Sequence, residues 1–149
     1  MTKFKLEVLA DKYKIVCFPV DYNLDFAKLL SNSKKDFLNI SQSSDELSII
    51  CNEEFQFESF TTDINVDIYN DKLKIEAGWK AFRILGTLDF GMVGVLSSIL
   101  NLLAKKNISI LAVSTYNTDY ILVKEEKLRE AINAIEDSNI AEFTEYRQY

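Results

Sequence analysis

The sequence predicts an α+β fold in which helices cover one face of antiparallel sheets. Several short segments alternate apolar and polar residues, which is the period of a half-buried strand. Residues 88–107 instead repeat apolar residues at helical spacing. In the C-terminal half the elements follow the order strand, helix, strand, strand, helix, which predicts a split βαβ arrangement: four antiparallel strands with two helices on one face.

The N-terminal half is predicted to hold at least four strands and one short helix. Residues 4–9 alternate clearly, "ADK" is expected to turn, and residues 13–18 form a second strand that Pro19 ends. The other expected elements are a weak helix within residues 24–30, strands over 37–41 and 47–51, and a hairpin of 64–69 and 72–77 that turns at Asn70 and Asp71.

The C-terminal half carries the stronger patterns. A strand over residues 79–86 is expected between Gly78 and Gly86, and Asp89 is a candidate cap for the helix of residues 88–107. The later elements are strands over 108–115 and 119–123, a helix over 125–137 with Leu128, Ala131, Ile132 and Ile135 as its apolar face, and a candidate last strand in 141–149. We expect two units, residues 1–75 and 76–149, the first a reduced copy of the second.

Composition narrows the function classes. The 149 residues carry a net charge of -6, whereas proteins that neutralise phosphates usually show a basic face, so nucleic acid and anionic membranes are unexpected partners. The chain has no histidine, the commonest general base and metal ligand, and we expect neither an enzyme nor a metal or other cofactor.

Cys17 and Cys51 are expected as buried thiols or as one bridge. No apolar stretch reaches membrane-spanning length, which predicts a soluble, cytoplasmic protein.

The loop "TLDFGMVG" before the long helix is one candidate binding segment. Gly91 and Gly94 would let a ligand approach the backbone, and the first helical turn offers unpaired N–H groups that favour an anion. The alternative is that the two glycines only allow close packing of helix and strand. From spacing alone, packing is the better supported of the two.

The polar segment "STYNTD", residues 114–119, is the second candidate. Asp119 would face a cation, while Thr115 and Tyr116 would offer backbone carbonyls. We expect the strand that ends here to lie beside strand 79–86, close to the start of the long helix. The two segments together would suit a zwitterionic amino acid. Equally, Asn117, Thr118 and Asp119 could simply build a hairpin turn.

Three motifs carry a resemblance to a known family: the entry "WKAFR…GTLDF", the strand pair "ISILAVSTYNTDYILV" and the helix start "KEEKL". From about Glu76 to Ile135 the chain closely resembles the ACT domain, in the branch related to the cytosolic arginine sensors and their small bacterial homologues. "FKLEVLADKYKIVCF" and "DELSIICNEE" are similar to the weaker first unit of those homologues. The stretch from Phe55 to Lys74 is longer than that pattern.

The resemblance implies two ferredoxin-like βαββαβ units, the N-terminal one degenerate, that act as a regulatory module without catalysis. It also implies an amino acid or similar small ligand, bound where two ACT units meet, and hence a homodimer and a regulated protein partner. The implied ligand contacts are Phe90, Gly91, Met92 and Val93 before the helix, the backbone of Thr115 and Tyr116, and Asp119. The alternative is an oligomerisation module without a ligand. An RNA-binding module of the same topology is disfavoured by the acidic charge.

Overall fold

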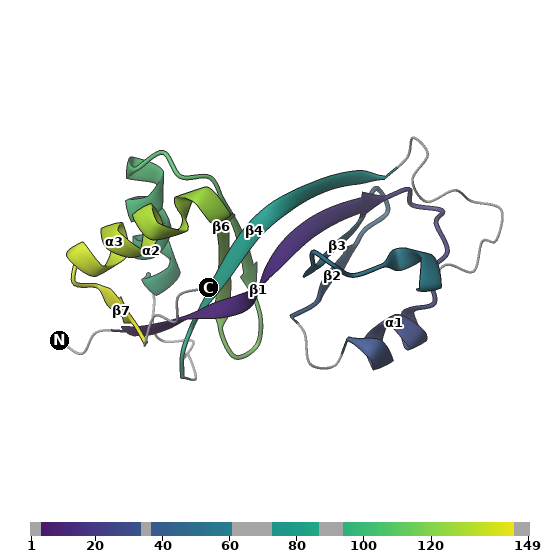
Figure 1. Ribbon diagram of the computed structural model, residues 1–149, viewed down its shortest axis with the longest axis horizontal. Helices are drawn as coiled ribbons and strands as arrows, with labels where there is room; N and C mark the ends of the chain where they lie inside the picture. The colour runs from purple at the N-terminus through teal and green to yellow at the C-terminus, as the bar shows by residue number, and fades with distance from the viewer. Residues whose placement is uncertain (1–3, 34–36, 61–72, 87–93, 145–149) are drawn as a thin grey trace. The chain divides into compact units, whose positions relative to one another are not determined.

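The computed structural model describes residues 4–33, 37–60, 73–86 and 94–144 (Figure 1). The chain divides into two compact units. Unit 1 combines the chain up to Lys12 with the chain from Trp79 onward, and unit 2 is Tyr13–Gly78. Two long strands, β1 (Phe4–Phe18) and β4 (Lys74–Ile84), therefore contribute one part to each unit.

Unit 1 is a mixed α+β structure in which two helices pack on one face of a sheet (Figure 1). Within this unit the strand order is β5-β6-β4-β1, and β7 pairs with β1. Beyond the parts of β1 and β4, its elements are α2 (Val95–Lys105), β5 (Ile110–Ser114), β6 (Asp119–Lys124), the 3-10 turn η2 (Glu125–Lys127), α3 (Leu128–Asp137) and β7 (Ala141–Phe143).

The core of unit 1 lies between the sheet and these helices. Phe82 from β4 and Ile121 from β6 are fully buried there against Ile99 of α2 and Ile135 of α3. Burying one such side chain contributes about 1.5–3 kcal/mol. The apolar face expected for the last helix is confirmed, because all four of its predicted residues are buried in this cluster.

Unit 2 has its own core, which is rich in aromatic rings. Phe18 packs edge-on against Phe57, and Phe55 stacks on Phe60. Asp25 caps α1 by accepting a hydrogen bond from the backbone N–H of Lys28 at 3.0 Å. Its elements, between the parts of β1 and β4, are α1 (Phe26–Asn32), β2 (Asn39–Gln42), β3 (Leu47–Asn52) and the 3-10 turn η1 (Phe57–Phe60), and the strand order is β2-β3-β1-β4.

Two expected strand breaks are wrong. The turn predicted at residues 10–12 is absent, because β1 continues from Phe4 to Phe18. Gly78 does not begin a new strand either: β4 passes through it with a φ of 82°, a conformation that glycine adopts without a Cβ clash. Pro19 does follow the end of β1, as predicted.

The sheet of unit 1 also differs from the expected four antiparallel strands. β1 is a fifth strand, placed next to β4, and the N–H of Leu85 donates to the carbonyl of Lys5 at 2.8 Å. β7 pairs with β1 in parallel, from Phe4 opposite Ala141 to Leu6 opposite Phe143. The first residues of the chain therefore complete a sheet that otherwise comes from its C-terminal half.

Several smaller predictions have mixed outcomes. The short helix and the strand of residues 47–51 are confirmed, and both cysteines are free rather than bridged. The turn at Asn70 and Asp71 and the cap at Asp89 lie outside the described residues. Within the described segments, no helix is long and apolar enough to cross a membrane.

Candidate functional site

The segment of residues 114–119, called the polar turn below, joins β5 to β6. The backbone N–H and the hydroxyl of Thr115 both donate to the carbonyl of Thr118, at 2.8 and 2.9 Å. The N–H of Thr118 in turn donates to the hydroxyl of Thr115 at 3.2 Å. These contacts close the hairpin, so Thr118 builds the turn as the hairpin interpretation expects, and Thr115 takes part as well.

Asp119 is the first residue of β6 and lies opposite Ser114, the last residue of β5. The Ser114 hydroxyl donates to its Oδ1 at 2.6 Å, and the Asp119 residue is half-buried. Side chains alternate along a strand, and Ile121 and Val123 point into the core beneath the helices. Asp119 therefore lies on the helix-covered face, at the end of the sheet.

Thr118 fixes the polar turn to the neighbouring strand. Its side chain is buried, and its hydroxyl donates to the carbonyl of Ile84, the last residue of β4, at 2.5 Å. From the sequence, Thr118 is predicted only as a turn residue, because nothing in the local pattern shows which strand its hydroxyl reaches.

The expected position of β5 beside β4 is wrong, because β6 lies between them. β6 is antiparallel to both strands, so β4 and β5 run in the same direction and end at the same edge of the sheet. α2 connects the end of β4 to the start of β5. The chain therefore leaves β4 at the edge where Asp119 lies, and the buried residues of α2 pack on the same face of the sheet as Asp119.

Glycine at the entry to α2 has a structural reason. Gly94 directly precedes Val95, the first helical residue, and has a φ of 90°. Only a residue without Cβ adopts this conformation readily. The implied contacts Phe90, Gly91, Met92 and Val93 lie outside the described residues. Of the other implied contacts, Thr115 and Tyr116 sit in the exposed tip of the polar turn, and Tyr116 is 81% exposed.

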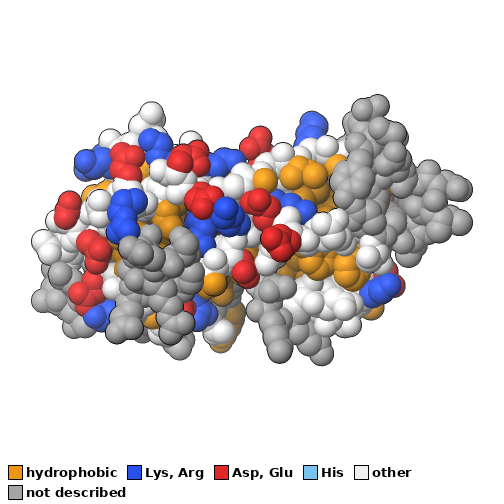
Figure 2. Space-filling model, viewed as in Figure 1, with side chains coloured by type: hydrophobic (Ala, Val, Ile, Leu, Met, Phe, Trp, Pro, Cys, Tyr) orange, Lys and Arg blue, Asp and Glu red, His pale blue; other side chains and the backbone are white. Residues whose placement is uncertain are grey.

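A groove lies on the surface of unit 1. This groove, of about 460 Å³, is lined by Lys106, which follows α2, and by residues of η2 and α3, among them Glu126, Arg129 and Asp137. Lys106 lies at the C-terminal end of α2. Two basic and three acidic side chains line the groove, so their charges largely offset one another. Figure 2 shows the same mixture of acidic and basic side chains over the described surface of the face that it draws.

Metal-binding geometry is a separate question from the binding of an organic ligand. Among the residues that the structure describes, no group of three or more His, Cys, Asp or Glu side chains could hold an ion together. The polar turn offers one carboxylate with a hydroxyl beside it, which suits a singly charged organic cation better than a divalent metal.

Solved structures share this fold at low sequence identity. The protein Atu0741 from Agobacterium tumefaciens superimposes with a TM-score of 0.74 at 21% identity, over 100% of this chain and 98% of that one. Aspartate kinase from Clostridium acetobutylicum gives 0.61 at 14%, over 89% of this chain and 34% of the enzyme. The ligand-free regulatory subunit of aspartate kinase from Thermus thermophilus gives 0.57 at 8%, over 89% and 95%.

Sequence comparison adds a family for part of the chain. No curated protein matches the sequence. A family model does match it over residues 74–137, the segment that runs from the start of β4 through α2, β5 and β6 to the end of α3. It contains the polar turn and Asp119. The family matched by residues 74–137 is the ACT domain.

Proposed function

We propose that this protein is a non-enzymatic regulatory module that binds an amino acid, or a similar small zwitterion, at the edge of unit 1 where the polar turn meets the start of α2. The observation that carries the proposal is the position of Asp119, half-buried on the helix-covered face at that edge. A carboxylate there can accept hydrogen bonds from a ligand ammonium.

The other half of the proposed site is the start of α2. The first turn of a helix leaves N–H groups without intrahelical partners, and these suit a carboxylate. In the loop before this helix, the proposed ligand contacts are Phe90, Gly91, Met92 and Val93. From the polar turn, the backbone of Thr115 and Tyr116 is also proposed to contact the ligand. The identity of the ligand depends on whether Asp119 binds its α-ammonium group or a basic side chain. The resemblance to the arginine sensors makes arginine the first candidate.

The proposal extends to the assembly. Unit 2 follows the order strand, helix, strand, strand, 3-10 turn, strand, so we regard it as a degenerate copy of the same plan, with η1 in place of a second helix. We propose a homodimer in which two ACT units meet at the ligand, a regulated protein that reads its occupancy, and a cytoplasmic setting. The likeness of the fold to the regulatory subunit of aspartate kinase supports the regulatory role.

Calorimetric titration of the purified protein with each of the twenty amino acids tests the proposal. We expect one of them to bind, and Asp119→Asn to weaken it at least about tenfold, since a charge-assisted hydrogen bond contributes roughly 1.5–3 kcal/mol. Asp45→Asn is the matched control, because Asp45 is an exposed acid in the turn between β2 and β3. Absence of binding by every amino acid at millimolar concentration would rule the sensor out.

The second candidate is an oligomerisation module without a ligand. β5 ends the strand order, so its outer edge is the observation in favour of pairing with another chain. Sedimentation of wild type and Asp119→Asn, with and without amino acids, separates the two hypotheses. A mass that depends on neither the variant nor the ligand favours the oligomerisation module.

A further inference from the structure

Lys80 is a lysine in the interior of unit 1. It lies on β4, is only 4% exposed, and shares a face of the strand with the fully buried Phe82. Burying an ammonium group costs several kcal/mol unless its N–H groups find acceptors. Packing alone does not explain a lysine at this position, because methionine would fill a similar space without a charge.

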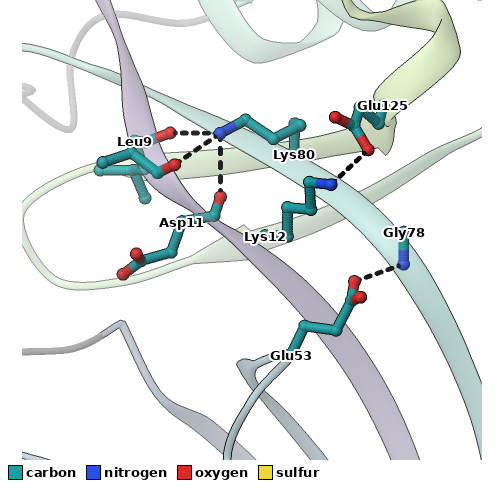
Figure 3. A network of polar contacts seen from close by, with 8 residues as sticks. Leu9, Asp11, Lys12, Glu53, Gly78, Lys80 and Glu125 are labelled. Carbon is teal, nitrogen blue, oxygen red and sulfur yellow. Dashed lines mark hydrogen bonds and ion pairs between the residues drawn. The ribbon is translucent and has the colours of Figure 1, made fainter. Parts of the chain in front are cut away.

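The acceptors are three successive backbone carbonyls of β1. Lys80 Nζ donates to the carbonyls of Leu9 at 3.1 Å, Ala10 at 2.8 Å and Asp11 at 3.1 Å. Figure 3 shows the ammonium reaching these oxygens from β4. In a regular strand successive carbonyls point to alternate sides. Three carbonyls that converge on one atom therefore mark a local distortion of β1, which continues as a strand on either side.

A second contact holds the next residue. Lys12 Nζ lies 3.1 Å from Glu125 Oε2 at the start of η2, and both side chains are about half exposed (Figure 3). An exposed pair of this kind contributes about 0–1 kcal/mol. Lys12 is also the last residue that β1 contributes to unit 1. The buried ammonium of Lys80 is thus the stronger of the two attachments of this segment.

The surrounding charges do not cancel the cost of burial. Burial lowers the pKa of Lys80, the carboxylates of Glu125 and Asp11 act in the opposite direction, and Lys12 adds to the lowering. A lowered lysine pKa means that the fold disfavours the charged form relative to water. Replacing a buried ion pair by apolar groups of similar size often leaves overall stability unchanged, because the recovered desolvation cost offsets the lost attraction. We expect the same offset between the buried charge of Lys80 and its three hydrogen bonds, an offset that a neutral donor does not have. The charge of Lys80 is therefore better explained by local geometry than by overall stability.

We propose that Lys80 is a conformational lock: its ammonium group fixes the distorted segment Leu9–Asp11 of β1 in the sheet of unit 1 and contributes little to the overall free energy of unfolding. The lock is independent of the ligand proposed above, because it uses different residues: Lys80 binds β1 from the interior of β4, whereas the polar turn contacts Ile84 at the end of that strand. Without it, β1 would lose its fixed path near the point where the chain leaves unit 1.

The test compares Lys80→Met with wild type by amide hydrogen exchange and by urea unfolding. We expect the amides of residues 9–13 to exchange about tenfold faster or more, which corresponds to the loss of roughly one buried hydrogen bond. Amides of β5 and β6 should keep their rates, and the urea midpoint should change little. Lys5→Met is the matched control, since Lys5 also lies on β1 but pairs with Glu142 at the surface.

Two results would overturn the lock. One is an exchange pattern of Lys80→Met that equals that of wild type. The other is uniform acceleration throughout unit 1 with a lower urea midpoint, which would make Lys80 an ordinary stabilising residue.

If Lys80→Met does not fold, nitrogen-15 spectra of the wild-type lysine ammonium groups decide. One ammonium signal with slowly exchanging protons and a coupling to a carbonyl of residues 9–11 supports the lock. Exchange of every lysine ammonium at the rate of an exposed one contradicts it.

Discussion

The hydroxyl of Thr118 donates to the carbonyl of Ile84 at 2.5 Å, and this contact joins the polar turn to the end of β4. Thr118 is only 6% exposed, so neither group can readily turn to water instead. Asp119 follows directly in the chain. The position of Asp119, the carboxylate proposed to bind the ligand ammonium, therefore depends on the hydrogen bond of its neighbour Thr118.

We expect Thr118→Val to destabilise the protein by about 1–3 kcal/mol, because it keeps the shape of the side chain and leaves the Ile84 carbonyl without this donor. Urea unfolding followed by circular dichroism measures the change. Thr118→Ser keeps the hydroxyl and should lose much less. A loss in Thr118→Ser as large as that in Thr118→Val would show that the methyl group matters as much as the hydrogen bond, and would contradict this explanation.

Gly78→Ala should destabilise the protein by roughly 1–2 kcal/mol, because a Cβ is strained at a φ of 82°. Apart from Gly78 and its two chain neighbours, no described residue has a heavy atom within 4 Å of the position that the new Cβ would take, so the cost comes from the backbone and not from a clash with another part of the fold. Gly78→Asn is the comparison, since asparagine tolerates positive φ better. A lower midpoint for Asn than for Ala in urea unfolding would contradict the backbone explanation.

The sequence predicts which helices and strands unit 1 contains better than it predicts which strands lie next to one another. The helix of residues 128–137 was foreseen because its four buried residues repeat at helical spacing, a signal that is local in the chain. The insertion of β1 beside β4 was not foreseen. It joins residues about eighty positions apart, such as Lys5 and Leu85, and alternation within a strand does not reveal which strand will pair with it.

The same contrast between local patterns and strand pairing explains which parts of the candidate site are predictable from the sequence. Asp119 stood out because a carboxylate between two apolar strands is unusual, and the hairpin around it follows from turn chemistry. That β6 separates β4 from β5 required the three-dimensional pairing. Lys80 gave no signal at all, because a lysine that alternates with apolar residues on a strand reads as a solvent-facing position.

Burial predicts opposite outcomes for two isoleucines. Ile121 is fully buried in the core of unit 1, so Ile121→Ala should cost about 2–5 kcal/mol through lost burial and the cavity left behind. Ile75 is 47% exposed, so Ile75→Ala should change stability by less than about 0.5 kcal/mol. Thermal unfolding of both variants checks the pair. Similar losses would mean that Ile75 is covered in solution.

The two free thiols should react differently. Burial raises the pKa of Cys51 to about 12, while the nearby Lys14 acts weakly in the opposite direction. The thiolate is the reactive form, so in the native protein at pH 8 Cys51 should resist alkylation and label only after denaturation. Cys17 is partly exposed and should label first. Mass spectrometry of peptides after iodoacetamide treatment identifies the labelled residue, and rapid native labelling of Cys51 would contradict its burial.

The raised pKa of Cys51 also makes stability depend on pH. The folded thiol keeps its proton up to about pH 12, whereas the unfolded thiol has the ordinary value of 9.0. Above pH 9 the unfolded state therefore holds fewer protons, and the stabilisation that is complete below pH 9 is lost as the pH rises towards 12. Each full unit in this window should cost about 1.4 kcal/mol. Urea midpoints of wild type and Cys51→Ala between pH 8 and 10.5 measure it, and we expect the shallower decline in the variant. Parallel declines would show that the thiol ionises alike in both states.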